Sequence, residues 1–204
     1  MKALSEATQA RFASHVRAMI MYEPPTSILG LPAPPATWPA SVDLKAMSTF
    51  MSSVQLSWLT SYFTHGDLST RDVAVLSYAG GATSRVPTVE NMTVEDIASI
   101  VERDGGAVDV QAMRATKGPA LGMYRKACFD RATREMVPRM KVCVLCGTNT
   151  VPECIAGFWD VMEDDEGRGG GFVEGIIVPG MNHFIHWDNA AVAVKLVREV
   201  IDGV

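Results

Sequence analysis

The apolar positions at the start of the chain predict a helix, a strand and then a stop. Residues 3–12 carry helix formers without a breaker, and residues 16–22 form a short, mostly apolar run. Glu-Pro-Pro at 23–25 ends this run, and residues 24–39 hold six of the eleven prolines, a density that prevents a regular helix. We therefore expect a buried strand over 16–22 and a domain boundary directly after it.

Between residues 40 and 137 the apolar positions recur every three or four residues, which is the period of an α-helix. Four helices are expected in this block, over about 43–62, 69–79, 93–104 and 109–136. The second and third begin at pairs with capping-box spacing, in which Asp stands where Glu is usual. These pairs are Ser69 with Asp72 and Thr93 with Asp96. We therefore expect this block to be almost entirely helical.

After Pro138 the pattern returns to short apolar strands that alternate with helices. Residues 141–146 and 172–178 have the composition of buried strands, and a helix to about residue 163 lies between them. The acidic, glycine-rich residues 163–171 predict a solvated loop, and a last helix is expected over 188–202 with Asp188 as its N-cap. Strands and helices that alternate with short loops indicate parallel pairing and an α/β layer.

Composition and charge exclude several classes of protein. Of the 204 residues, 48% are hydrophobic and 20% are charged, which is the mixture of a soluble domain with a sizeable core. The formal net charge of −5 leaves no broad positive field, so we expect no nucleic-acid partner. The chain has no apolar signal region and no run of about 18 apolar residues, so we expect no membrane partner and a soluble, cytoplasmic protein.

The four cysteines are expected to be reduced thiols, and Cys143 and Cys146 are expected to be buried. Cys143 and Cys146 have the spacing of a CxxC motif, which elsewhere marks a redox pair or half of a zinc site. Within a strand, residues three apart point to opposite faces, so these two sulfurs are not expected to meet. No second CxxC or paired histidine completes a tetrahedral set, and Cys128 and Cys154 form no motif. We therefore expect no metal and no cofactor.

One of the four histidines has surroundings that point to catalysis. His15 and His65 have no neighbouring groups that form a constellation, so solvated surface positions are expected for both. His183 lies in Pro-Gly-Met-Asn-His-Phe, directly after the strand predicted over 172–178, and His186 follows three residues later. Side chains at the carboxyl ends of open parallel sheets face the ligand crevice. The alternative is that backbone groups of the loop merely provide the hydrogen-bond partners of the His183 ring.

The last part of the chain resembles the C-terminal end of α/β-hydrolases. It contains a strand, a Gly-Met-Asn-His-Phe loop, a second histidine, Trp-Asp and a long terminal helix. In that family the catalytic histidine lies in such a loop after the eighth strand. Residues 16–25 resemble the sixth strand and residues 141–147 the seventh. The resemblance implies an α/β fold with a partial hydrolase core over 1–25 and 138–204, in which helices flank three parallel strands. Residues 26–137 would be an inserted helical cap.

The resemblance also implies roles for individual residues. His183 would be the general base, and a carboxylate on its other ring nitrogen would fix the tautomer. Glu23, at the end of the sixth strand, occupies the acid position of some family members; Glu153 is the second candidate. The alternative is that Glu23 only turns the chain before Pro24. The family presents its nucleophile on a Gly-x-Ser-x-Gly elbow, and this sequence contains none.

Two functions remain open at this stage. The first is a hydrolase of an ester, an amide or a similar small apolar substrate, represented by a chain that lacks its serine and is therefore inactive alone. The second is a non-catalytic, hydrolase-like remnant that binds a small apolar ligand or a partner chain through its cap. Because a fifth strand flanks the sixth in the complete fold, residues 16–22 would be an apolar sheet edge, which favours a homodimer.

Overall fold

Three parallel strands form the sheet of this protein. The computed structural model describes residues 5–34, 53–80, 85–101 and 118–203. The strands are β1 (Ala18–Tyr22), β2 (Lys141–Gly147) and β3 (Glu174–Val178), in the order β1-β2-β3. Ala18 pairs with Lys141, and Cys143 pairs with Glu174. The predicted α/β fold with three parallel strands is confirmed, and β1 lies at one edge of the sheet that the described residues form.

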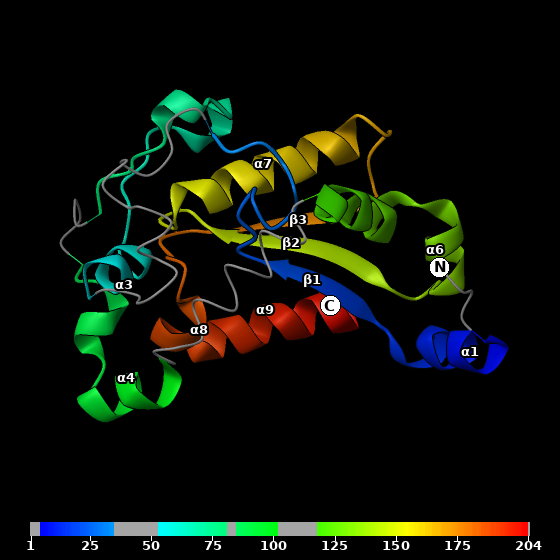
Figure 1. The fold of residues 1–204 in the computed structure, drawn as a ribbon, viewed down its shortest axis with the longest axis horizontal. Helices are drawn as coiled ribbons and strands as arrows, with labels where there is room; N and C mark the ends of the chain where they lie inside the picture. Colours follow the sequence, from blue (N-terminus) through cyan, green and yellow to red (C-terminus); the bar gives the residue numbers. More distant parts are fainter. Residues whose placement is uncertain (1–4, 35–52, 81–84, 102–117, 204) are drawn as a thin grey trace.

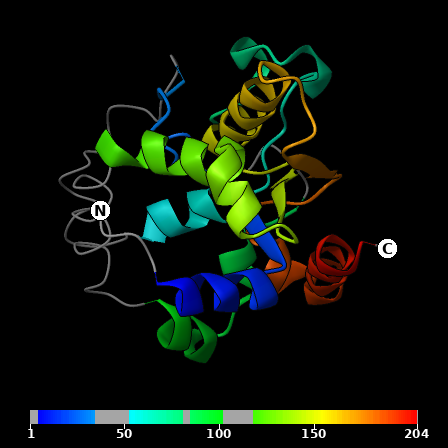
Figure 2. The same cartoon turned by 90° about the vertical axis from the view of Figure 1, so that its right-hand side faces the viewer.

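Helices cover both faces of this sheet (Figures 1 and 2). α7 (Pro152–Glu166) packs against β2 from one side, and α9 (Ala190–Asp202) contacts β1 and β2 from the other. Side chains alternate along β2, as a strand requires: Val142, Val144 and Cys146 join the apolar cluster with α7. Leu145 instead packs with Ile185 and with residues of α9. The two sides of the sheet therefore have separate cores.

Several of the predicted helices are present in the structure, at least in part. α1 (Glu6–His15) precedes β1, α3 (Ser53–Leu59) lies within the helix predicted over 43–62, and α6 (Arg131–Met136) leads to β2. Residues 118–129 are also helical. Short α8 (Ile185–Asp188) precedes α9. Residues 60–62 of the first predicted helix are not helical, and residues 43–52, 102–104 and 109–117 of the predicted helices lie outside the described residues.

The capping box at Thr93 is confirmed. The Thr93 hydroxyl accepts a hydrogen bond from the backbone N–H of Asp96, and the Asp96 carboxylate accepts one from the backbone N–H of Thr93. The helix that begins there, α4 (Val94–Ile100), is shorter than predicted. η3 (Thr88–Asn91), a turn of 3₁₀ helix, precedes it.

The prediction of an α-helix over residues 69–79 is wrong. Two 3₁₀ turns, η1 (Leu68–Thr70) and η2 (Val73–Val75), occupy this stretch. The Asp67 carboxylate accepts the Ser69 N–H at 2.9 Å, and the Asp72 carboxylate accepts the Ala74 N–H at 2.8 Å. Asp72 therefore caps its own turn instead of closing a box with Ser69. Such local side-chain bonds compete with helix formation.

Two further details near α7 and α9 differ from the prediction. α9 is capped by the Asn189 side chain, which accepts the Val192 N–H, so Asp188 is not the N-cap. The region predicted as a solvated loop over 163–171 begins inside α7. The buried Asp165 carboxylate accepts the backbone N–H groups of residues 171–173, which fixes the path of the loop into β3.

The middle of the chain packs into the same core as the sheet. Leu31, Leu76 and Tyr124 belong to the apolar cluster that contains Val144 of β2 and residues of α7. The predicted division into a core and a cap stays a prediction, but the described parts of both share this cluster. The four cysteines are free, and the burial predicted for Cys143 and Cys146 is confirmed; Cys128 and Cys154 are buried as well. Among the described residues, none of the helices has the length and the apolar content needed to cross a bilayer.

Gly157 allows α7 to approach the turn that follows β1. A Cβ atom at this position would lie 2.2 Å from the carbonyl oxygen of Pro24 and 3.2 Å from the backbone nitrogen of Thr26. Both neighbours are backbone atoms, so the contact cannot be relieved by a side-chain rotation.

We predict that Gly157→Ala destabilises the protein even though alanine favours helices. Overpacking typically costs about 1–3 kcal/mol, and the measurement is the free energy of unfolding in urea. Gly122→Ala is the matched control: Gly122 lies in the helical residues 118–129, and its Cβ would meet nothing within 4 Å. That variant should gain up to about 1 kcal/mol. Equal effects at the two positions would contradict this description of the α7 contact.

Candidate functional site

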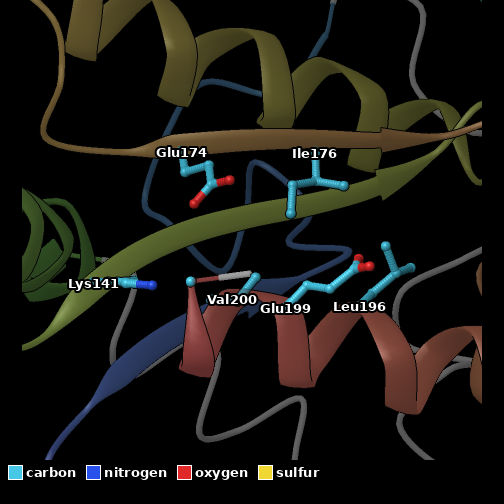
Figure 3. Close-up of a pocket in the computed structure, with 7 residues that line it drawn as sticks. Lys141, Glu174, Ile176, Leu196, Glu199 and Val200 are labelled. Atoms are coloured by element: carbon cyan, nitrogen blue, oxygen red, sulfur yellow. The ribbon is translucent and has the colours of Figure 1, made fainter.

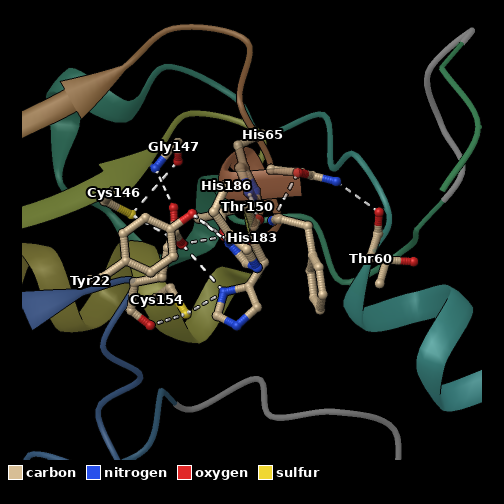
Figure 4. Close-up of polar contacts among 12 residues, drawn as sticks. Tyr22, Thr60, His65, Cys146, Gly147, Thr150, Cys154, His183 and His186 are labelled. Carbon is tan, nitrogen blue, oxygen red and sulfur yellow. Dashed lines mark hydrogen bonds and ion pairs between the residues drawn. The ribbon is translucent and has the colours of Figure 1, made fainter. Parts of the chain in front are cut away.

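The candidate site lies where the carboxyl ends of the three strands meet (Figure 4). Glu23 directly follows β1, Cys154 lies in the first turn of α7 after β2, and His183 lies in the loop between β3 and α8. Parallel strands bring such residues to one edge of the sheet, which is where α/β proteins bind ligands. The fold therefore brings together three side chains from distant parts of the sequence.

Glu23 is the buried centre of this site. Its side chain is 1% exposed, and its backbone has φ 49°, in the left-handed region that non-glycine residues seldom adopt. The carboxylate accepts the backbone N–H of Gly147 at 2.6 Å and the hydroxyl proton of Thr150. These bonds offset the cost of burying a carboxylate.

The structure places Glu23 against His183. The distance from His183 Nδ1 to Glu23 Oε2 is 3.6 Å, which is longer than a hydrogen bond and within the range of an ion pair. The His183 side chain is 25% exposed, so the ring joins the buried carboxylate to the surface. Glu153, the other candidate acid, is the second residue of α7. Burial and the Glu153 charge raise the pKa of Tyr78 to about 12, so Glu153 lies near Tyr78.

Cys154 completes the group around His183. Its Sγ donates to the backbone oxygen of Glu23 at 3.1 Å and lies 3.8 Å from His183 Nδ1. Burial, and next the negative charge of Glu23, raise the pKa of the Cys154 thiol well above its usual range. The free thiol therefore stays protonated near neutral pH, and it is not an activated nucleophile. No sequence motif pointed to this cysteine.

His186 and Tyr22 form the other wall of the site. The Tyr22 hydroxyl lies 3.3 Å from His186 Nδ1 and donates to the backbone oxygen of His183 at 3.4 Å. Burial and the Glu23 charge raise the pKa of Tyr22 above its usual range, so the phenol remains a donor. Burial lowers the pKa of His186, and the neighbouring His183 lowers it further.

A buried polar network holds the His183 loop against the middle of the chain. Asn182 is 0% exposed; its amide donates to the Thr60 oxygen and to the Thr88 hydroxyl, both at 2.8 Å. Its own oxygen accepts the backbone N–H of Phe184 at 2.9 Å. The Asp188 carboxylate accepts the hydroxyl protons of Thr88 and Tyr62. The loop that carries His183 is therefore positioned from both sides.

Arg85 extends this network toward the surface. Its guanidinium lies 3.7 Å from the centroid of the Tyr62 ring and donates to the Tyr62 hydroxyl at 2.7 Å. It also donates to the backbone oxygen of Gly180 at 2.6 Å. Sequence reasoning missed this network, because its members are single polar residues without a shared spacing.

The surface position predicted for His65 is wrong. His65 Nδ1 accepts the Ser77 N–H at 3.0 Å, and Nε2 lies 2.9 Å from the Thr150 oxygen, to which it donates in the neutral ring. The ring also stacks on Phe63. His65 therefore supports the turn whose Thr150 binds Glu23. His15 is exposed, as predicted.

A separate cavity lies at the opposite end of the sheet (Figure 3). Its volume is about 470 Å³, and it is lined by Lys141 and Glu174, the first residues of β2 and β3, together with Ile176 and residues of α9. The amino ends of the strands form this end, whereas Glu23 and His183 lie at the carboxyl ends. The cavity is therefore not part of the candidate site.

Comparison with protein-family models gives no match to this sequence, and no curated protein and no solved structure matches it. Of the fold that the resemblance to α/β-hydrolases implies, the structure shows only the general arrangement, which is a three-stranded parallel sheet flanked by helices. The functional argument consequently rests on the residues of this chain.

We predict that Asn182→Ala lowers the free energy of unfolding by about 1–3 kcal/mol, because it leaves buried hydrogen-bonding groups without a partner. Urea unfolding measures this change. Asn91→Ala, at an exposed asparagine, serves as the control and should stay within about 0.5 kcal/mol of the parent protein. A loss at Asn182 no larger than at Asn91 would show that the network does not hold the loop.

Acid should destabilise the protein partly through His65. Burial, the largest cause, lowers the pKa of His65 from its usual 6.5 in the folded state. The unfolded chain therefore takes up the proton first, and the stability that the neutral ring contributes is lost as the pH falls below about 6.5. Unfolding free energies measured from pH 8 to pH 5 should fall less steeply for His65→Gln. His15→Gln should keep the parent slope; an unchanged slope for His65→Gln would contradict the prediction.

Proposed function

We propose that Glu23 and His183 are the acid and the general base of an α/β-hydrolase-type acyl transfer. The substrate class is an ester, an amide or a similar small apolar compound. The observation that carries this proposal is the 3.6 Å contact between a buried carboxylate and a partly exposed imidazole at the carboxyl ends of parallel strands. The geometry favours Glu23 over Glu153 as the acid.

The arrangement suits the chemistry of the reaction. A serine hydroxyl is a weak nucleophile until an imidazole within hydrogen-bond reach accepts its proton. A carboxylate on the other ring nitrogen holds the required tautomer and stabilises the imidazolium that forms. In this protein Nδ1 is the ring nitrogen near Glu23, so Nε2 would accept the proton. Contacts of this kind are often long before substrate binds and shorten in the reacting complex.

On this proposal the nucleophile would come from polypeptide outside these 204 residues. The sequence contains no Gly-x-Ser-x-Gly elbow. Cys154 does not replace it, because its buried thiol is protonated and lies on the Nδ1 side of the ring. The 204-residue chain alone should therefore show negligible turnover, whereas the same chain joined to a segment that carries the elbow should be active.

The first test uses the 204-residue chain and a fluorophosphonate probe, which labels activated serines. We expect no labelling and no burst of product from a chromogenic ester. Labelling of a serine in this chain, abolished by His183→Ala, would overturn the assignment of the nucleophile to another segment.

The second test uses the chain expressed together with the coding sequence upstream of Met1. We expect esterase or amidase turnover, which His183→Ala should lower on the order of a millionfold and Glu23→Gln on the order of ten-thousandfold in kcat. Glu153→Gln should stay within a few-fold of the parent enzyme. If the extended protein has no elbow and no turnover, the non-catalytic alternative, ligand or partner binding, replaces the hydrolase proposal.

A further inference from the structure

We propose that Glu23, Cys154 and His183 form a binding site for a divalent metal ion of the zinc class. A carboxylate oxygen of Glu23, Sγ of Cys154 and Nδ1 of His183 all lie within 4.8 Å of one another. This inference goes beyond the hydrolase proposal and does not depend on it, because metal binding needs no nucleophile. It also departs from the expectation from sequence spacing, which considered only ligands that are close in the chain.

Two of the three distances between the donor atoms are close to those of a tetrahedral site, and the third, from the Glu23 carboxylate to Cys154 Sγ, is within 4.8 Å. Zinc binds sulfur at about 2.3 Å and nitrogen or oxygen at about 2.0–2.2 Å, so tetrahedral ligand atoms lie about 3.3–3.7 Å apart. The distance from His183 Nδ1 to Glu23 Oε2 is 3.6 Å, and that from His183 Nδ1 to Cys154 Sγ is 3.8 Å. Shifts of a few tenths of an ångström would therefore bring His183 Nδ1 into ligand distance of both partners, and the Glu23 oxygen and Cys154 Sγ would move by up to about 1 Å toward each other.

The types of the donor atoms select the metal. A thiolate, an imidazole and a carboxylate together are typical of zinc and its soft neighbours, whereas Mg²⁺ and Ca²⁺ prefer oxygen ligands. Three protein ligands leave a fourth position open, as in catalytic zinc sites. The His183 side chain is 25% exposed while Glu23 is buried, so a water molecule would reach the metal from the His183 side.

The charge balance also favours the metal. A divalent cation with the Glu23 carboxylate and a Cys154 thiolate gives a net charge of zero, which suits a buried site. The cation would replace the thiol proton, because cysteine binds metals as the thiolate. Gly147 and Thr150 hydrogen-bond the carboxylate and would orient it as a ligand, which is the usual role of outer partners in metal sites.

Metal binding and the proposed acyl transfer would exclude each other at His183. Both use Nδ1, so a bound ion would separate the ring from the Glu23 carboxylate. Zinc would therefore inhibit a hydrolase built on this pair. The two proposals can fail independently, because metal binding is measured here without any substrate.

The test is a Co²⁺ titration of the reduced, metal-free 204-residue chain. We expect thiolate-to-cobalt charge-transfer absorption that saturates at one equivalent and disappears when Zn²⁺ is added. Release of about one proton per metal should accompany binding, because cysteine binds as the thiolate and an ordinary thiol, with a pKa of about 8.5, carries its proton at neutral pH. Cys154→Ser should abolish the absorption. Cys128→Ser, at another buried free cysteine, is the matched control and should retain it.

A second variant keeps the test decisive if Cys154→Ser does not fold. His183→Gln changes the most exposed ligand and should weaken Co²⁺ binding by more than about 100-fold, because loss of an outer partner alone costs about 10–100-fold. Circular dichroism should show that this variant is folded. The proposal is overturned if the folded parent chain gives no charge-transfer absorption at millimolar Co²⁺. Absorption that survives in folded Cys154→Ser, or unchanged affinity in folded His183→Gln, would also overturn it.

Discussion

The hydrogen bond from the Gly147 backbone N–H to the Glu23 carboxylate is the interaction on which the candidate site depends. The Glu23 N–H still donates to the Leu145 oxygen and so continues the parallel pairing of β1 with β2. The chain then turns away with φ 49° at Glu23. In a continued strand the Glu23 backbone carbonyl would accept the Gly147 N–H, but here the Glu23 side chain accepts it instead. The Glu23 carbonyl oxygen is thereby left to accept the Cys154 thiol. The strand end thus holds a carboxylate inside the protein.

A carboxylate in this position has a structural role, and we propose a chemical role for it as well. The Gly147 N–H and the Thr150 hydroxyl satisfy it from the sheet side, and His183 lies on its remaining side. The cost of burying its charge is met locally, so the fold does not require the imidazole to be there. In the first proposal a proton on His183 Nδ1 faces the Glu23 carboxylate, and the two residues form an acid–base pair. In the second proposal a metal ion lies between the carboxylate, the Cys154 thiolate and the ring.

The sequence predicted the parts of the structure that depend on local patterns. Short apolar runs identified all three strands, and two of these runs end at Glu-Pro-Pro or Pro-Gly. The alternation of strands with helices identified their parallel pairing. His183 could be chosen because its loop follows a strand, and Glu23 because it ends the segment that resembles the sixth strand of α/β-hydrolases. Patterns failed where tertiary contacts decide: His65 is held by Ser77 and Thr150, and Asp72 bonds its own turn. Cys154 and Asn182 carry no periodic signal, because their partners are distant in the chain.

The central claim, that Glu23 and His183 act as a pair, is tested most directly by the tautomer of the neutral His183 ring. Nitrogen-15 NMR of the metal-free chain reports which ring nitrogen carries the proton. The account predicts that the proton is on Nδ1, which faces the Glu23 carboxylate. A neutral ring with its proton on Nε2 would direct the Nδ1 lone pair at the carboxylate, and that result would contradict the account.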